Sequence, residues 1–191
     1  MLIHSARVKR GDTIIEVMFA FVIFSLVVVG SVMLMNKGIA LAQQSLEITQ
    51  VRSQIDAQIT MIKYLQQQTD DTIWRQLLAN EVGAPVDSFG GTSSCPTVTE
   101  LQAKKAFFLA RKGSPAIIDA TSIGPTSYQD AVAYSIVDQT TLTPKAYGMW
   151  VQLAKAEGAG AYDVHVRACW GSIGASRPMM IGTVVRLYDI R

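Results

Sequence analysis

Hydrophobic and polar residues are distributed very differently along the two halves of the chain. From Val17 to Met35 the sequence carries no charge, and Ser25 and Ser31 are its most polar residues. The 23 residues from Thr13 to Met35 would form a helix of about 34 Å, which is longer than the ~30 Å hydrocarbon core of a bilayer. No second stretch approaches that length, so the pattern predicts one membrane-spanning helix.

Beyond Lys37 the pattern changes to that of an amphipathic helix. Apolar residues recur mostly at steps of three or four, with Gln, Ser, Arg, Asp and Lys between them. These apolar positions are Ile39, Leu41, Leu46, Ile48, Val51, Ile55, Ile59, Ile62 and Leu65. We expect the membrane helix to continue directly to about Gln68, with an apolar stripe that a sheet must cover.

The second half of the chain is rich in turns. All six prolines fall between Pro85 and Pro178, and proline disfavours helix interiors. The pattern predicts a short helix over 70–82, a loop over 83–99, a hairpin from 106–110 and 116–118, and a short strand over 131–137.

The last fifty residues carry the clearest strand signals, over 147–153, 162–170 and 181–190. In the middle strand Tyr162, Val164, Val166, Ala168 and Trp170 alternate with Asp163, His165, Arg167 and Cys169, so the two sets lie on opposite faces. Three or four antiparallel strands packed on an amphipathic helix predict a two-layer α+β domain. Trp150 is expected on the outer sheet face or under a loop, which makes it the aromatic residue to consider for a subunit contact.

Glu16 is the acid at the edge of the uncharged run. A carboxylate costs roughly 2.5–3.5 kcal/mol at the centre of a bilayer and less near its surface. The simplest alternative is an ordinary signal anchor whose first turn carries a Glu near the headgroups. We favour a functional role, in which Glu16 has a charged partner, because the residues before it are also distinctive.

Those residues form a short basic leader. Arg7, Lys9 and Arg10 precede Gly11, and the apolar run follows almost at once. A secretory signal peptide has its apolar stretch first and its cleavage site afterwards. Here the natural cleavage site lies before the apolar run, on the cytoplasmic side that the basic residues indicate. Cleavage there would leave the membrane helix on the mature protein.

The segment from Lys9 to Val17, KRGDTIIEV, resembles the N-terminus of type IV prepilins and type II secretion pseudopilins. In that family a prepilin peptidase cleaves after the Gly and methylates the new N-terminal amine. The resemblance implies that Gly11 precedes the cleavage, that Asp12 becomes the N-terminus and N-methylation candidate, and that Glu16 is the assembly glutamate. The motif covers residues 7–36. Asp12 departs from the Phe that is usual after the cleavage site, which puts methylation in doubt more than cleavage.

The resemblance implies a pilin-like organisation with four parts. These are a leader at 1–11, a transmembrane and filament-core helix at 12–36, its amphipathic continuation at 37–69, and a globular α+β domain at 70–191. The expected partners are the prepilin peptidase, other pilin subunits, and membrane lipid before assembly. We expect a single-pass protein with a cytoplasmic N-terminus and an exported C-terminal domain, which then enters an extracellular or periplasmic filament.

Three functions are compatible with this N-terminal segment. The leading hypothesis is a subunit of a type IV pilus-like filament, with the irregular loops and Asp12 favouring a minor subunit. The second is a pseudopilin of a type II secretion or competence system. The third is a membrane-anchored binding domain that never polymerises, which predicts an uncleaved leader and tolerance of Glu16→Ala.

Charge gives no general signal for nucleic-acid binding. The chain has 17 Lys and Arg against 15 Asp and Glu, a net charge of +2. The leader holds three of the basic residues, so a chain starting at Asp12 would carry 14 basic and 15 acidic side chains, a net charge of −1. A surface ligand or DNA could therefore bind only through a local patch.

Cys95 and Cys169 are the only cysteines, and both follow the membrane segment. If this part of the chain is exported, an oxidising compartment favours a disulfide between them. The alternative is two reduced thiols in the core. A zinc site would need four ligands, and the two histidines include one in the leader, so no metal or cofactor is expected.

The sequence predicts no enzyme. Asp163 and His165 share a strand face, and Ser172 follows in a nearby loop, which superficially suggests a catalytic triad. Residues at i and i+2 on an exposed strand face are usually a solvated pair, and no nucleophile-elbow sequence is present.

Overall fold

The structure is a computed structural model, and it describes residues 12–68, 72–83, 85, 94–112, 117–140, 143–156, 160–172 and 174–188. The side chains are described from Ile14 onward. The helices in these segments are α1 (Asp12–Gln67), α2 (Thr72–Ala79) and α3 (Val98–Ala103). The strands are β1 (Phe107–Lys112), β2 (Ile117–Ser122), β3 (Tyr128–Gln129), β4 (Ile136–Asp138), β5 (Lys145–Tyr147), β6 (Met149–Lys155), β7 (Ala161–Trp170) and β8 (Met179–Tyr188).

Helix α1 is continuous over 56 residues, as the sequence predicted. The chain divides into two units, Met1–Ala42 and Gln43–Arg191, and α1 contributes to both. In the second unit the buried side chains of α1 recur mostly at steps of three or four, as expected for one helix face. These side chains are Glu47, Val51, Ile55, Gln58, Met61, Ile62 and Leu65.

The predicted apolar stripe was wrong at its beginning. Ile39, Leu41 and Leu46 are 48%, 65% and 65% exposed, and the buried face starts at Glu47. The error arose because the sequence pattern continues without a break past the point where the globular unit begins to cover the helix.

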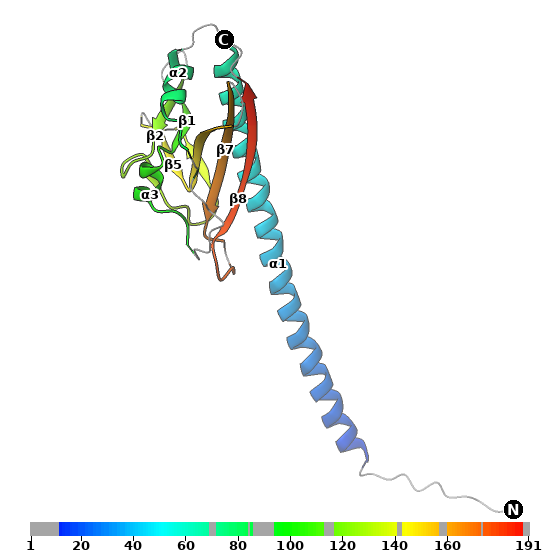
Figure 1. Ribbon diagram of the computed structural model, residues 1–191. Coiled ribbons are helices and arrows are strands. Elements are labelled where there is room, and N and C mark those ends of the chain that lie inside the picture. The colour runs from blue at the N-terminus through cyan, green and yellow to red at the C-terminus, as the bar shows by residue number, and fades with distance from the viewer. Residues whose placement is uncertain are drawn as a thin grey trace, which may run out of the picture. The chain divides into compact units, whose positions relative to one another are not determined.

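A five-stranded antiparallel sheet packs against this second part of α1, in the order β2-β1-β6-β7-β8. Figure 1 shows β7 and β8 running beside the helix. Val164, Val166, Ala168 and Trp170 of β7 are 1% exposed or less, and they form part of one hydrophobic core with the helix. The α+β class and the helix-facing side of β7 are therefore as predicted.

Gln58 joins α1 to the sheet at a place where two strands separate. β1 pairs with β6 only at Phe107 and Val151. Two residues further along, the Leu109 N–H donates to Gln58 Oε1 at 2.8 Å, and Gln58 Nε2 donates to the Leu109 carbonyl at 2.9 Å. The buried amide thus replaces a neighbouring strand for both backbone groups, which would otherwise be costly to bury.

The outer face of the sheet is covered at β6. All residues from Met149 to Ala154 of β6 are buried, and Gln152 Nε2 donates to the carbonyl of Lys104, just after α3, at 3.1 Å. Trp150 is 0% exposed. The suggestion that Trp150 makes a subunit contact was therefore wrong, because the second layer over β6 hides its ring.

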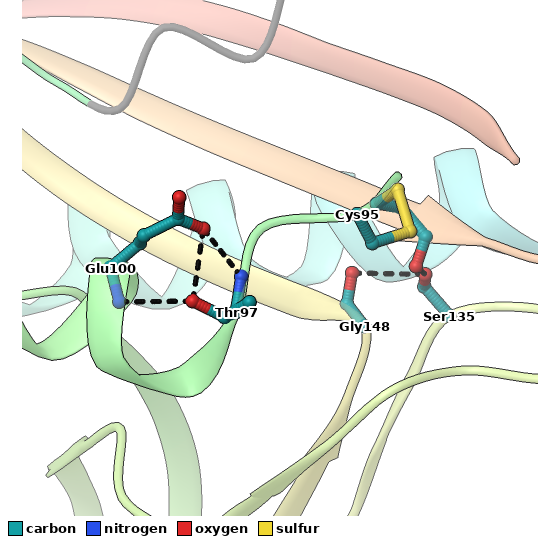
Figure 2. Close-up of a disulfide and its surroundings, with 6 residues drawn as sticks. Cys95, Thr97, Glu100, Ser135 and Gly148 are labelled. Atoms are coloured by element: carbon teal, nitrogen blue, oxygen red, sulfur yellow. Dashed lines mark hydrogen bonds between the residues drawn. A yellow bond between two sulfur atoms is a disulfide. The ribbon is translucent and has the colours of Figure 1, made fainter. Parts of the chain in front are cut away.

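The sequence also missed α3, which lies partly in the predicted loop. Thr97 Oγ1 accepts from the Glu100 N–H at 3.3 Å, and Glu100 Oε2 accepts from the Thr97 N–H at 2.7 Å. This reciprocal pair is a capping box (Figure 2). The hydrogen bonds from Thr97 lower the pKa of Glu100, so the carboxylate stays charged at the helix start.

A second, small sheet has the order β3-β5-β4. It leads into β6 through Gly148, whose φ of +62° lies in the left-handed region. The Gly148 carbonyl accepts from the Cys169 N–H at 2.7 Å and from Ser135 Oγ at 3.1 Å. Any side chain at this position would collide with the Cys169 backbone. The glycine therefore lets the small sheet turn closely against the end of β7.

Candidate functional site

Glu16 is an isolated acid on the most apolar part of α1. Its side chain is exposed, and no described residue donates a hydrogen bond to it or forms an ion pair with it. Every large apolar side chain from Ile14 to Met35 is exposed, by 44% to 72%. Glu16 therefore lies among apolar side chains that only lipid or another molecule can shield from water.

The hydroxyl groups of this segment have partners within the helix. Ser25 Oγ donates to the Phe21 carbonyl at 2.8 Å, and Ser31 Oγ donates to the Val27 carbonyl at 2.7 Å. Such bonds satisfy hydroxyls in an environment without water. The carboxylate of Glu16 can be satisfied only by a donor outside the described residues.

Helix α1 is long and apolar enough to cross a membrane. None of its most apolar window is buried inside the protein, whereas the core helix of a water-soluble domain would be mostly buried. The exposed apolar surface suits lipid or the apolar surface of another protein.

The predicted cleavage site lies mostly outside the described residues. Gly11 and the basic leader residues fall outside them, and so does the side chain of Asp12, whose backbone begins α1. Cleavage after Gly11 and methylation at Asp12 remain predictions.

The disulfide between Cys95 and Cys169 is present, with the two Cα atoms 5.7 Å apart. It joins the segment before α3 to the last part of β7 (Figure 2). Ser135 Oγ also donates to the Cys169 carbonyl, at 3.2 Å. Disulfide, small sheet and β7 are thereby held together at one end of the globular unit.

Glu47 is a buried acid that the sequence interpretation missed. It is 8% exposed, and its Oε2 accepts from Trp170 Nε1 at 3.0 Å and from Ser172 Oγ at 2.6 Å. The signal was available, because Glu47 precedes Val51 and Ile55 at helical spacing. An acid at such a position is usually read as part of the solvated face.

The structure does not assemble the suggested triad. Ser172 donates to Glu47 on α1, whereas Asp163 accepts two hydrogen bonds from Arg186 of β8, at 2.8 and 2.9 Å. These bonds lower the pKa of Asp163, and burial is the main cause that lowers the pKa of His165. Asp163 is therefore one half of a cross-strand ion pair. In the part of the chain that the structure describes, no three His, Cys, Asp or Glu side chains gather as metal ligands would.

The chain matches no protein-family model, no curated protein and no solved structure. Its likeness to prepilins consequently rests on the residues of the N-terminal motif, and its α+β fold rests on the structure described above.

Proposed function

We propose that this chain is a non-enzymatic subunit, most simply a minor pilin, of a type IV pilus-like filament. A prepilin peptidase would remove residues 1–11, and the apolar part of α1 would hold the mature subunit in the cytoplasmic membrane. The observation that carries the proposal is the unpartnered carboxylate of Glu16 in the segment from Ile14 to Met35, where every large apolar side chain is exposed.

A neighbouring subunit would supply the missing partner. Cleavage after Gly11 creates a cationic amine at Asp12, four residues or about 6 Å from Glu16 along the helix. When the apolar helices of two subunits pack side by side, the amine of one pairs with Glu16 of the other. Loss of one partner of such a buried pair typically costs about 3–5 kcal/mol.

This pairing would also fix the axial register of the helices. Apolar packing alone permits neighbouring helices to slide, because one apolar side chain replaces another at little cost. A single buried ion pair selects one register. Methylation would leave the charge of the amine unchanged, so the pairing does not depend on whether Asp12 is methylated.

The second unit supports export of the C-terminal part. Its disulfide is the kind of link that persists in an oxidising compartment, and the basic residues of the leader favour a cytoplasmic N-terminus. The same features suit a pseudopilin of a secretion or competence system. For that function too, the site is Glu16 together with the cleavage site, and the same experiment tests it.

The test uses the full-length chain in a host that carries a prepilin peptidase and a filament assembly system. Mass spectrometry should find Asp12 at the N-terminus of the wild-type protein, and Gly11→Leu should retain the leader. Glu16→Ala should still be cleaved but should not enter filaments.

Ser25→Ala is the matched control, because the Ser25 hydroxyl is satisfied inside the helix and its loss should leave assembly unchanged. Filaments that contain Glu16→Ala at the wild-type level, or assembled wild-type protein that retains Met1, would contradict the proposal. A wild-type chain that keeps its leader and enters no filament would instead favour the non-polymerising anchor.

A further inference from the structure

Strand β8 forms one edge of the five-stranded sheet (Figure 1), and no strand of the described chain pairs with its other side. It is ten residues long and pairs with β7 over its whole length without a bulge. An edge strand presents a row of N–H and carbonyl groups to other chains, and proteins usually shorten, bend, charge or cover such edges. The opposite edge strand, β2, is shorter, with six residues, and carries Asp119.

The hydrogen bonds of β7 determine which backbone groups of β8 point outward. The Cys169 N–H donates to the Gly148 carbonyl on the β6 side, and the backbone groups of successive residues point to opposite sides of a strand. The even-numbered residues of β7 therefore bond to β8, where the register places Val164 opposite Val185. The residues of β8 whose backbone groups point away from β7 are consequently Met180, Gly182, Val184, Arg186 and Tyr188.

One end of this edge has a partner on α1. The Tyr188 carbonyl accepts from Gln66 Nε2 at 2.6 Å, which agrees with the assigned direction. Within the part of the chain that the structure describes, no group bonds to the outward N–H and carbonyl groups of the other four residues. The open stretch of the edge therefore runs from Met180 to Arg186.

The side chains along the open stretch do little to protect it. Val184, in the middle of β8, is 54% exposed, and Gly182 has no side chain that could shield the backbone. Arg186 is the one charged residue of β8, and its guanidinium is held by Asp163 of β7. Lys and Pro, which often protect an edge, are both missing from the sequence of β8.

Cations flank this edge. Lys63 of α1 lies beside Leu187 on the inner face of the sheet, and Arg177 precedes β8 in the chain. Both side chains are exposed, and neither forms an ion pair with a described residue. Arg52 and Asp56 share the side of α1 that carries Lys63, by helical spacing. The charges along the edge therefore sum to a net positive value, which suits an acidic partner.

We propose that the edge of β8 from Met180 to Arg186 binds an extended segment of another protein, which adds a sixth strand to the sheet. Backbone hydrogen bonds supply affinity in this mode of recognition, and alternate side chains supply specificity. Apolar residues of the partner would pack on Met180 and Val184, while acidic residues on its other face would approach Lys63.

The charges disfavour a second copy of this chain as the partner. Antiparallel pairing of two β8 strands would bring the end of one strand opposite the beginning of the other. Lys63 of one copy would then approach Arg177 of the second, and like charges across an interface oppose association. The inference does not depend on the proposed filament, because it concerns the globular unit alone.

Binding of a synthetic strand to the purified full-length chain in detergent tests the proposal. The probe is a capped peptide of ten residues, the length of β8, in which Val alternates with Thr and Glu. Its binding should slow hydrogen exchange, measured by NMR, at the amides of residues 180, 182, 184 and 186. The amides of residues 181, 183 and 185 bond to β7 and should exchange slowly with and without the peptide.

Matched controls separate backbone pairing from general apolar contact. The same peptide with N-methyl groups on the amides that face β8 keeps its side chains but loses its donors, so it should bind at least about ten-fold more weakly. Val184→Pro removes an N–H that points away from β7, so the fold should persist while peptide binding falls to a similar extent. Val185→Pro removes a donor to β7 and should lower the unfolding midpoint.

Four results would overturn the proposal. These are no binding at millimolar peptide, equal binding of the N-methylated peptide, equal binding by a folded Val184→Pro protein, and unchanged exchange at the edge amides. Light scattering tests the other occupant, because a wild-type dimer that Val184→Pro abolishes would show that the edge binds a second copy instead. No filament is needed for these measurements, so a chain that binds the peptide but does not assemble would contradict only the proposed function.

Discussion

The indole of Trp170 donates a hydrogen bond to Glu47 across 3.0 Å, between the last residue of β7 and the first buried residue of α1. Trp170 directly follows Cys169, so the bond connects the helix to the disulfide-linked end of the sheet. Glu47 lies five residues after the end of the first unit. The pair therefore marks the place where α1 becomes part of the globular unit.

Removing this acceptor should destabilise the globular unit. Glu47→Ala would leave the indole N–H of Trp170 buried without a partner, at a cost of about 1–3 kcal/mol in the free energy of unfolding. Denaturant unfolding of the detergent-solubilised full-length chain, followed by tryptophan fluorescence, measures the effect. Glu47→Gln keeps an acceptor at the same place and should cost less. Equal stability of Glu47→Ala and the wild type would show that the bond contributes nothing.

The disulfide should contribute more than any single hydrogen bond. It links residues 74 positions apart, and the chain-entropy model assigns about 4.5 kcal/mol to a loop of that length. Unfolding curves with and without reductant should differ by up to this amount, and Cys95→Ser with Cys169→Ser should match the reduced protein. Thiol labelling of the exported, denatured and unreduced protein should give no signal. Two labelled thiols would disprove the bond in the exported protein.

Two groups on the outer sheet face predict lower stability in acid. Burial lowers the pKa of His165, and Arg186 lowers that of Asp163. In both cases the unfolded chain binds its proton at a higher pH than the folded chain, so stability falls as the pH falls. The histidine effect should begin near pH 6.5 and the aspartate effect near pH 4.

Difference measurements separate these two effects. His165→Gln should remove the decline in unfolding free energy between about pH 7 and 5, while Arg186→Gln should change only the decline at lower pH. A His165→Gln protein that retains the full decline above pH 5 would show that another group is responsible.

Periodicity predicted the parts of the fold that depend on the burial of whole faces. The helix to about Gln67, the hairpin of β1 and β2, and the last three strands follow from apolar residues at spacings of three to four or of two. The disulfide followed from the number of cysteines and their expected compartment. Each of these features is supported by many residues, so one residue that departs from the pattern does not change the prediction.

Individual buried polar residues were not predictable in this way. Glu47 and Gln58 occupy core positions because particular donors and acceptors meet them, from Trp170, Ser172 and the backbone of Leu109. Those partners are 51 or more positions away in the chain, and local sequence carries no record of them. The helix α3 was different, since Thr97 and Glu100 have the capping-box spacing that marks a helix start, and the glycines and serines before Cys95 obscured it.

The last prediction concerns the two glycines of α1, one near the end of the uncharged run and one just after it. Gly30 and Gly38 lie within continuous helix, and a Cβ atom at either position would meet no atom within 4 Å. Neither residue is therefore required by packing in the free chain. In a bilayer the backbone has no alternative hydrogen-bond partner, which keeps the helix intact despite a cost of about 1 kcal/mol for each glycine relative to alanine.

We expect any unwinding of α1 on transfer from the membrane into a filament to fall between these two glycines. Gly30→Ala with Gly38→Ala should leave leader cleavage unchanged, slow amide exchange in this stretch, and reduce the amount of filament. Gly83→Ala, at a glycine with equally open surroundings outside α1, serves as the control. A filament reconstruction with unbroken helix from Gly30 to Gly38, or with the break elsewhere, would refute the expectation. Low helix propensity would then not determine where the helix unwinds.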